Sequence, residues 1–321
     1  MSAVLRVLSW SKGGAKVVEP AELPKALATG KLTWIDITGP DDGEAAMMRD
    51  VLNFHPLAIE DTRNQHQRPK VEEYPNHLFL ILNPGDLREA ECHFRELDVF
   101  VAENLIVTVH PDPEPILAEA EARLARMFGA EVTPAHVLYA LLDTVVDGYF
   151  PMLDDLGDEI DELEDLVLER PDSDTLNRLF RLKRQLVQVR KVVAPQRDAM
   201  TLINRRDLPY LKTEQLSYYL RDVQDHLLRI TDMTDTFRDL LSSGIDLYMS
   251  ATSNRLNRVV NRLTVVTVVV GVLAVVTGFY GMNFEHTWPP FGSWWGVPFA
   301  LVLMAGAAAA VATLMRKLSK V

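Results

Sequence analysis

The sequence contains few of the residues on which compact chemical sites are usually built. It has 321 residues but only one cysteine, Cys92, so an internal disulfide and a zinc site made of several cysteines are excluded. It has no glycine-rich phosphate loop, and its Ser, His and Asp residues form no recognisable catalytic motif. We therefore expect neither an enzyme nor an organic cofactor, and we expect Cys92 to be an inert small residue.

Basic residues are also scarce relative to acidic ones. Lys and Arg number 33 against 45 Asp and Glu, which gives a formal net charge of −12 at pH 7. Because a phosphate backbone favours basic surfaces, general nucleic-acid binding is not expected.

Charge is missing altogether from two long stretches near the C-terminus. Residues 263–282 and 294–315 contain no Asp, Glu, Lys or Arg. A bilayer core about 30 Å thick needs roughly 20 helical residues, so each stretch is long enough to span a membrane. A buried hairpin of a soluble protein is the alternative, but core helices rarely stay uncharged on every face for this length. We therefore expect a multi-pass membrane protein with a C-terminal two-helix hairpin in the lipid bilayer.

The charges that flank these stretches predict the orientation. Arg255, Arg258 and Arg262 precede the first stretch, whereas the connecting loop contains no Lys or Arg. Positive residues favour the cytoplasmic side, so both termini are expected in the cytoplasm and the loop outside, in the inner or plasma membrane. The second stretch is followed by Arg316, Lys317 and Lys320, which predicts the same orientation. At the expected outer end there are aromatic residues typical of a membrane interface: Phe279, Tyr280, Phe284, Trp288, Phe291, Trp294 and Trp295.

The rest of the chain predicts an α/β domain followed by helices. Strands are expected at residues 32–38, 77–82, 96–102 and 105–110, and helices at 44–53 and 116–128, which fits an α/β domain with a mixed sheet. We divide the chain into a cytoplasmic α/β domain (1–130), a cytoplasmic helical stalk (131–262) and a transmembrane hairpin (263–321).

Hydrophobic periodicity and acidic charge describe the expected stalk. Eight of the twelve residues from 154 to 165 are acidic, which indicates either a solvated helix face or a reservoir of negative potential near a cation route. No proline occurs from residue 211 to 288, so one helix is expected from about residue 214 to 282, on the order of 100 Å long. The acidic helix has apolar residues at a coiled-coil spacing: Leu153, Leu156, Ile160, Leu163 and Val167. Pro171 is expected to end this helix, and Asp172 or Ser173 can cap the next one.

One face of the long helix is mostly small or polar. Such a face can line an aqueous path or pack tightly against other helices, and the two interpretations are compatible. A single hairpin cannot enclose a pore, so transport would need an oligomer with closed cyclic symmetry. The face consists of Asp246, Met249, Ser253, Asn257, Val260, Thr264, Thr267, Gly271, Ala274 and Gly278.

The outer end of the first apolar stretch carries the tripeptide Gly281-Met282-Asn283. Gly281 can release backbone carbonyl groups from helical bonding, and Asn283 offers an amide without net charge. A ring of such groups suits a cation that keeps its water shell, as Mg²⁺ tends to do. The tripeptide alone is a weak signal, but its place between two C-terminal spans is specific.

In these residues the chain resembles the CorA family of divalent-cation (Mg²⁺/Co²⁺) channels, the two-span metal ion transporters with the Gly-Met-Asn motif. The resemblance covers nearly the whole length. It is carried most specifically by Tyr280-Gly-Met-Asn-Phe-Glu285 and by His55-Pro-Leu-Ala-Ile-Glu-Asp61 with Gln67-Arg-Pro-Lys-Val-Glu72. Leu142-Asp143 with Asp147-Gly-Tyr-Phe150, and Arg238-Asp-Leu-Leu241 leading to Asp246-Leu-Tyr248, add to it.

The resemblance implies a funnel-shaped homopentamer whose long helices line a central pore. Gly281, Met282 and Asn283 would form the selectivity loop, with Asp246 and Asn257 as polar pore positions. Asp222 would belong to a regulatory metal site between subunits, with Asp86 as the nearest candidate partner and Glu89 as its alternative. Internal Mg²⁺ bridging these carboxylates would hold the closed state, and its loss would loosen the ring.

Three features depart from the family pattern. Gly271 and Val272 stand where family members often carry a bulky residue followed by proline, which leaves Val260, Leu263 and Gly271 as gate candidates. Glu285 is the one carboxylate of the outer loop, which continues with His286 rather than with Met-Pro-Glu-Leu. Ala274 stands where a small polar residue is common in the pore.

Two single histidines and one short segment each allow a functional and a structural interpretation. His286 could bind a softer metal but is more simply a solvated loop histidine. His226 could tune the Asp222 site or serve packing. The segment from His55 to Asp61 is expected to be structural, with Pro56 fixing a turn and the acids bonding the backbone or Arg63.

The function predicted from the sequence is influx of hydrated Mg²⁺, together with Co²⁺ and Ni²⁺. The alternatives are a Zn²⁺ transporter of the ZntB branch and, with less support, a membrane-anchored metal sensor that conducts nothing.

Overall fold

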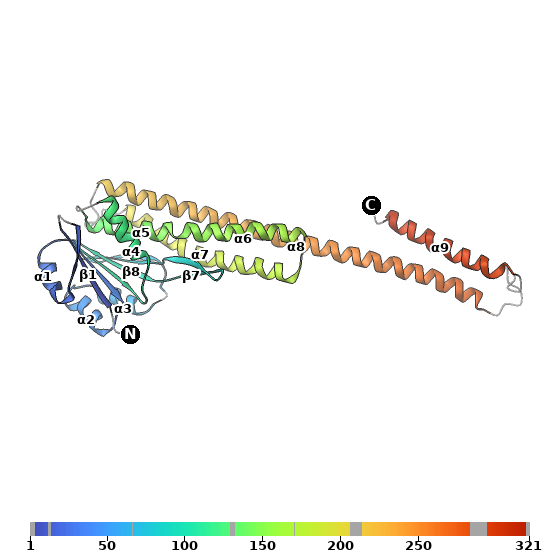
Figure 1. Ribbon diagram of the computed structural model, residues 1–321, viewed down its shortest axis with the longest axis horizontal. Coiled ribbons are helices and arrows are strands. Elements are labelled where there is room, and N and C mark those ends of the chain that lie inside the picture. The colour runs from blue at the N-terminus through green and yellow to red at the C-terminus, as the bar shows by residue number, and fades with distance from the viewer. Residues whose placement is uncertain are drawn as a thin grey trace. The chain divides into compact units, whose positions relative to one another are not determined.

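The computed structural model describes residues 4–11, 14–65, 67–128, 132–169, 171–205, 214–282 and 294–318 (Figure 1). The chain divides into two compact units. The first contains Met1–Leu166 and Asp172–Gly244, and the second contains Val167–Pro171 and Ile245–Val321. The predicted α/β part and most of the predicted stalk thus share one unit, while the functional division into three regions remains a prediction.

The first unit is built on a seven-stranded mixed sheet with the order β2-β1-β3-β9-β8-β5-β4. Only β3 and β9 pair in parallel, and the other neighbours are antiparallel. The strands are β1 (Val4–Ser11), β2 (Gly14–Val18), β3 (Thr33–Thr38), β4 (Lys70–Glu73), β5 (Leu78–Leu82), β8 (Leu97–Ala102) and β9 (Leu105–His110). A separate hairpin joins β6 (Gly85–Arg88) to β7 (Glu91–Phe94).

The four strands expected from the sequence are confirmed as β3, β5, β8 and β9, which occupy the middle of this sheet. All five residues of β5 are buried, as are the first five of β8, because helices or strands cover both faces there. The sequence analysis did not identify β1, β2, β4, β6 and β7: β2 and β4 are the edges of the sheet, β1 lies between β2 and β3, and β6 and β7 form the hairpin. Edge strands carry more polar and half-exposed residues, so their pattern is weaker.

One face of the sheet is covered by α2 (Asp42–Asp50) and α3 (Pro56–Arg63), with α1 (Leu23–Ala28) nearby after a 3₁₀ turn, η1 (Pro20–Glu22). Asp41 caps α2 through Gly43 and closes a reciprocal capping box with Glu44. The core on this face joins Met48 and Ala58 from the helices to residues of the central strands, including Ile35, Ile37, Phe79, Ile81, Phe100, Val107 and Val109.

The His55–Asp61 segment is structural, as expected, but it begins a helix rather than a turn. His55 Nδ1 accepts from the Leu57 backbone N–H at 3.2 Å, and Pro56 occupies the first turn of α3, where its missing N–H costs nothing. Asp61 binds Lys70 at 2.7 Å instead of Arg63, which pairs with Asp42 at 2.8 Å. The prediction of an Arg63 partner for these acids was wrong because Lys70 on β4 lies nearer.

The opposite face of the sheet is contacted by α5 (Pro134–Asp147), which packs against β8, β9 and α4 (Ile116–Met127). Residues 134–146 of α5 are all buried, so this helix is enclosed by protein around its whole circumference. Thr133 caps it through the His136 backbone N–H.

The remaining helices are α6 (Tyr149–Glu169), α7 (Ser173–Arg205), α8 (Glu214–Tyr280) and α9 (Gly296–Leu318). The long helix predicted from residue 214 is thus confirmed as α8. Asp172 accepts from the Thr175 backbone N–H at 2.9 Å and caps α7, one of the two caps expected. The five predicted coiled-coil positions of α6 are all buried: Leu153, Leu156, Ile160, Leu163 and Val167.

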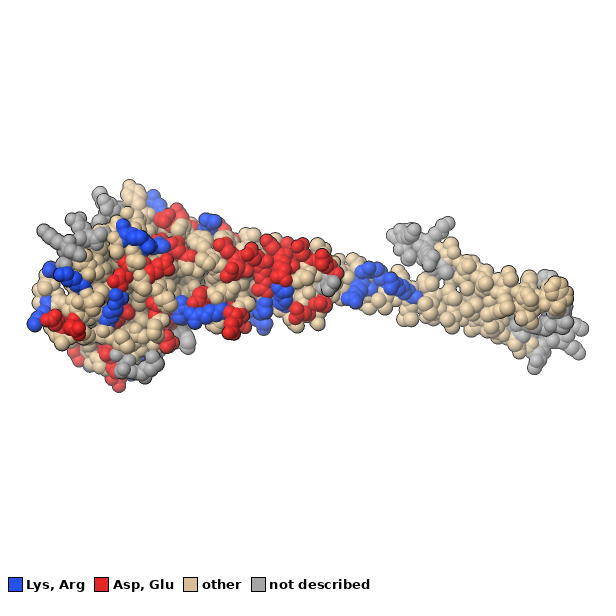
Figure 2. Space-filling view, in the orientation of Figure 1, with Lys and Arg blue, Asp and Glu red and all other residues tan. Residues whose placement is uncertain are grey.

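The acidic run of α6 lies opposite these buried positions and forms a charged surface (Figure 2). Glu159 pairs with Arg178 and Arg181 of α7, and Glu162 also pairs with Arg178. Most of the other acids are solvent-exposed, which favours the interpretation as a solvated helix face.

A buried polar network lies on the α5 side of the sheet. Trp34 Nε1 donates to Thr108 Oγ1 at 3.0 Å, and Thr108 donates to Asp36. Both ring nitrogens of His110 face acceptors: Nε2 lies 3.0 Å from Asp36 Oδ1, and Nδ1 lies 2.6 Å from the Asp112 carbonyl oxygen. Burial lowers the pKa of His110, but the hydrogen bonds and charge of Asp36 outweigh it, so the net pKa is raised.

This raised pKa predicts a pH-dependent contribution to stability. His110 contributes fully below the ordinary histidine value of about 6.5 and loses its contribution as pH rises through its higher folded pKa. We expect His110→Gln to lower the thermal unfolding midpoint of the full chain in detergent more at pH 5.5 than at pH 8.5.

The exposed His93 on β7 supplies the matched control, His93→Gln, whose effect on the midpoint should be small and similar at both pH values. An equal loss of stability at both pH values in His110→Gln would show that the charge of His110 contributes nothing.

Candidate cation sites

The predicted pore face lies on α8 within the second unit. Asp246 and Asn257 are both solvent-exposed, as are the gate candidates Val260 and Leu263, at 50% and 64% exposure. In the described part of the chain, one helix is long and apolar enough to cross a membrane, and it is this one, over Leu216–Phe279. The apolar part of α9 is shorter, Gly296–Val311, so the second predicted span remains a prediction.

The glycines of this face are not required for packing within the chain. A Cβ atom added at Gly271 or Gly278 would meet nothing within 4 Å. Thr264 and Thr267 donate their hydroxyl groups to the carbonyl oxygens of Val260 and Leu263, at 2.8 and 2.9 Å. The face therefore offers open space and satisfied hydroxyl donors, and another copy of the chain or water can approach it closely.

The end of α8 coincides with the Gly-Met-Asn motif. The Gly281 N–H still donates to Thr277 O at 2.9 Å, whereas the Met282 N–H turns to Phe279 O at 3.4 Å, a bond one residue shorter. A Cβ atom at Gly281 would lie 3.2 Å from the Thr277 carbonyl oxygen, so glycine allows this tight ending. Asn283, Glu285 and His286 lie outside the described residues.

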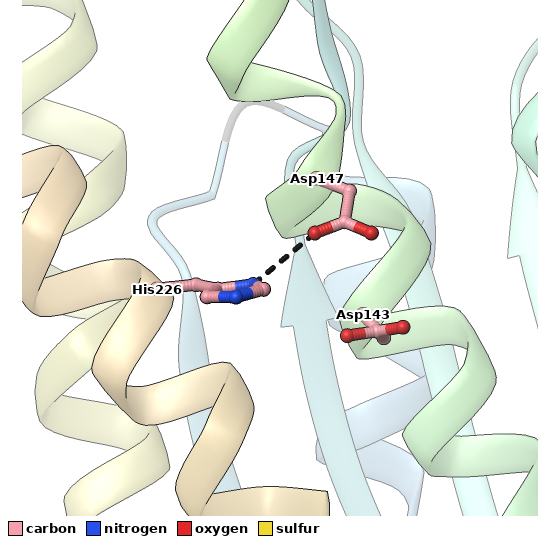
Figure 3. Close-up of side chains that lie close together, drawn as sticks. All are labelled: Asp143, Asp147 and His226. Carbon is pink, nitrogen blue, oxygen red and sulfur yellow. Dashed lines mark ion pairs between the residues drawn. The ribbon is translucent and has the colours of Figure 1, made fainter.

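A second candidate site lies in the first unit, between α5 and α8 (Figure 3). Asp143 and Asp147 follow one another by one turn of α5, and His226 on α8 faces them. One ligand atom from each lies within 4.8 Å of the other two, which is close enough to hold a single cation. We call these three residues the Asp-Asp-His cluster.

A guanidinium group already lies against this cluster. Arg123 of α4 forms ion pairs with Asp143 and with Asp147, the latter at 2.9 Å, and Tyr139 donates to Asp143 at 3.1 Å. His226 Nδ1 lies 3.2 Å from Asp147 Oδ1 but is not aligned for a hydrogen bond, so within the described residues this buried nitrogen has no hydrogen-bond partner. A divalent cation at the cluster would therefore compete with Arg123 for the two carboxylates, and His226 Nδ1 would be free to coordinate it.

Asp222 lies one helical turn before His226 and is solvent-exposed. Burial raises the pKa of Tyr139, the charge of Arg123 lowers it, and the negative charges of Asp222 and Asp147 raise it, with a net upward direction. Asp222 is therefore near enough to exert an electrostatic effect on Tyr139, which contacts the Asp-Asp-His cluster. Its exposed carboxylate can be reached by another molecule.

Asp86, the predicted partner of Asp222, is engaged within its own chain. Its Oδ2 atom accepts from Arg88 and Arg95, each at 2.8 Å. Burial raises the pKa of Asp86, but these two hydrogen bonds outweigh it and hold the net pKa below the usual range. A metal at Asp86 would have to compete with two guanidinium groups, whereas Glu89 is exposed at the tip of the β6–β7 hairpin.

Cys92 is a buried residue of β7, 3.8 Å from Gln185 Oε1, and burial raises the pKa of its thiol to about 11. A thiol that stays protonated at neutral pH is a poor nucleophile and metal ligand. Its burial and raised pKa support the expected inert role.

Comparison with known proteins identifies the family of the chain. The family model described as "CorA-like Mg2+ transporter protein" matches residues 29–317. The chain belongs to the CorA family.

Two relatives illustrate the match. The cobalt/magnesium transport protein CorA of Thermotoga maritima is 35% identical over 277 residues, which cover 85% of this chain and 78% of the relative. The structure of the complete CorA magnesium transporter from Methanocaldococcus jannaschii superposes with a TM-score of 0.81, covers 99% of this chain and 98% of its own, and has 23% sequence identity. The expected fold, an α/β domain followed by a long helix, is thereby confirmed.

The cytoplasmic domain of ZntB from Vibrio parahaemolyticus is more distant. It covers 79% of this chain and 99% of its own at a TM-score of 0.61 and 12% identity, so it shares the fold. The members of the CorA family, to which the chain belongs, are transporters rather than enzymes.

The sequence analysis gave no role to Asp143 and Asp147, although both occur in the segments that carried the CorA resemblance. A signal was available, since two carboxylates one turn apart on an otherwise apolar helix are costly to bury without a partner. The partners, Arg123 and His226, lie 20 or more residues away in the sequence and could be identified only from the fold.

The pairing of Arg123 with buried Asp143 predicts a large effect of removing the guanidinium. Arg123→Gln leaves an uncompensated carboxylate, which typically costs about 3–5 kcal/mol, and should lower the thermal unfolding midpoint of the full chain by several degrees. Adding Mg²⁺ should raise this midpoint more in the variant than in the wild type, because the competing cation is gone.

The double variant R123Q/D143N removes both charges and should recover much of the lost stability. A double variant no more stable than Arg123→Gln would show that side-chain packing, and not charge pairing, is what Arg123 supplies.

Proposed function

We propose that this chain forms a homopentameric channel for the entry of hydrated Mg²⁺, with Co²⁺ and Ni²⁺ as further cargo. The observation that carries the proposal is the open, polar face of α8. It begins at Asp246, continues past Asn257 and through the apolar span, and reaches Gly278, close to the end of α8 at Tyr280. A polar line inside an apolar helix is stable only where water or other protein covers it.

The polar face of α8 also supports an oligomer with closed cyclic symmetry. One hairpin cannot surround an ion, whereas a ring of identical helices places the same face towards a common axis. The empty space beside Gly271 and Gly278 lets neighbouring helices approach closely without a clash.

Selection of a hydrated ion is assigned to Gly281, Met282 and Asn283 at the outer mouth. Carbonyl and amide oxygens accept hydrogen bonds from coordinated water, so they can hold Mg²⁺ without removing its water shell. Val260, Leu263 and Gly271 are the candidates for the constriction. The exposed Val260 and Leu263 side chains would form a ring that excludes ions by dewetting.

The membrane potential supplies the driving force. Both termini face the cytoplasm and the loop faces outward, so Mg²⁺ moves inward down the potential. Moving two charges through 100 mV releases about 4.6 kcal/mol.

Feedback by internal Mg²⁺ would act at Asp222. Mg²⁺ joins the exposed Asp222 carboxylate to Asp86, or to the exposed Glu89, of a neighbouring subunit and holds the closed state. The Arg88 and Arg95 guanidinium groups set the threshold, because the ion must displace them from Asp86. His226 lies one turn further along α8 and would add a ligand from the Asp-Asp-His cluster.

Flux into vesicles that contain the purified chain tests the function. We expect Mg²⁺ uptake driven by an inside-negative potential, reduced by added Co²⁺ and less by Zn²⁺. Preferred Zn²⁺ uptake would assign the chain to the Zn²⁺ alternative, and no uptake of any of the three ions at any internal Mg²⁺ level would leave a non-conducting sensor.

Asn283→Ala tests the selectivity loop. We expect loss of selective Mg²⁺ uptake with an unchanged oligomer, because the amide that would hold the hydrated ion is removed. Asn104→Ala, in the exposed turn between β8 and β9, is the matched control. Mg²⁺ uptake by Asn283→Ala at the wild-type rate would refute this role.

Asp222→Ala tests the regulatory site. Mg²⁺ should protect the cytoplasmic part of the wild type from proteolysis, and the variant should need at least several-fold more Mg²⁺ for the same protection. Asp239→Ala changes an exposed acid on the same helix and should behave as the wild type does. Undiminished protection of Asp222→Ala would exclude it as a ligand.

A further inference from the structure

Three arginines form a basic stripe on α8, immediately before the apolar span. Arg255, Arg258 and Arg262 are spaced by three and four residues, so they lie on one side of the helix, and all three are solvent-exposed. Arg262 directly precedes Leu263, where the charge-free stretch begins. We call these three residues the arginine stripe.

Acidic residues are absent from the sequence on either side of the stripe. After Asp246, nine residues before Arg255, the sequence contains a single acid, Glu285, at the opposite end of the span. The one described polar contact of the stripe is from Arg258 Nε to the Asn254 carbonyl oxygen, at 3.4 Å. Figure 2 shows the blue side chains of this region next to the uncharged tan surface of the apolar span. Three positive charges are thus concentrated where a membrane surface would begin.

The stripe points away from the proposed pore. At about 100° per residue, its mean direction is roughly opposite to that of the polar face of Asn257 and Thr264. It lies roughly 40° from a line of half-buried valines further along the helix, Val265, Val269, Val272 and Val276, which is the side that other protein covers. The arginines therefore face the outer side of the helix rather than an ion path.

The height of the stripe matches a lipid headgroup layer. Arg255 and Arg262 are seven residues apart, or about 10 Å along the helix. A bilayer adds about 5–7 Å of headgroup region to each side of its apolar core, and a long arginine side chain can extend its guanidinium group towards it. Guanidinium groups bind phosphate oxygens through paired N–H donors, which the choice of arginine over lysine favours.

We propose that the arginine stripe is a binding site for the phosphate group of anionic phospholipids in the cytoplasmic leaflet. The proposal rests on the membrane orientation given above. The negative charge of a lipid bound there reduces the repulsion among the three arginines and fixes the depth at which α8 enters the bilayer. It would be present on each copy of the chain, independently of the ion that passes.

The test uses the full chain in nanodiscs of phosphatidylcholine with one quarter phosphatidylglycerol, released into native mass spectrometry. The wild type should retain phosphatidylglycerol. The variant R255Q/R258Q/R262Q should retain at least tenfold less, since each basic residue near an anionic surface contributes on the order of fivefold. R255K/R258K/R262K keeps the charge and should retain an intermediate amount.

The matched control is K183Q/R184Q/K191Q, which removes the same charge from α7 and should retain phosphatidylglycerol as the wild type does. Equal retention by R255Q/R258Q/R262Q and the wild type would overturn the proposal, and so would equal losses in both triple variants. Displacement of the lipid by millimolar inorganic phosphate would assign the site to free phosphate instead. Loss of the oligomer in R255Q/R258Q/R262Q, with a wild-type oligomer that persists in pure phosphatidylcholine, would show that the stripe binds another copy of the chain.

Ion flux in pure phosphatidylcholine vesicles separates the two proposals. Retention of phosphatidylglycerol without any flux would support the lipid site and refute the channel function. Flux without selective retention of phosphatidylglycerol would support the channel function and refute the lipid site.

Discussion

The cost of removing charge from water governs the C-terminal part of this protein. From residue 263 to 282 no charged side chain occurs, yet one line of the same helix remains small and polar. A lone helix with this composition gains little from lipid along its polar line, whereas a ring of copies can turn that line inward. The same cost explains why the arginines stop at residue 262, where the apolar stretch begins.

In the first unit the cost of burying charge is reduced by ion pairing. Asp143 is buried and shares Arg123 with Asp147, and Asp86 shares its oxygen between two guanidinium groups. Each of these carboxylates already has a guanidinium partner. A metal that binds there exchanges one cation for another, so its effect depends on competition with arginine as well as on its own affinity. This arrangement suits a site that responds to concentration rather than one that binds permanently.

Much of the architecture could be predicted from the sequence, and the misses have physical causes. The central strands were found because both their faces are apolar, and α8 was found because no proline interrupts it. The edge strands were missed because exposure weakens alternation, and α3 was taken for a turn because Pro56 signals both a turn and a helix start. The Lys70 partner of Asp61 and the Arg123 partner of Asp143 depend on strands and helices brought together by the fold. The loop that contains Asn283 lies outside the described residues, so its role is still a prediction from the motif.

The threonines of the α8 face have a consequence for which ions can approach it. Because Thr264 and Thr267 give their hydroxyl hydrogens to carbonyl oxygens of their own helix, each presents only oxygen lone pairs outward. A corridor walled by such hydroxyls looks electronegative to a passing solute although it carries no formal charge. In the proposed pore, chloride would be repelled at these two positions, whereas the water shell of a cation would find acceptors for its hydrogens.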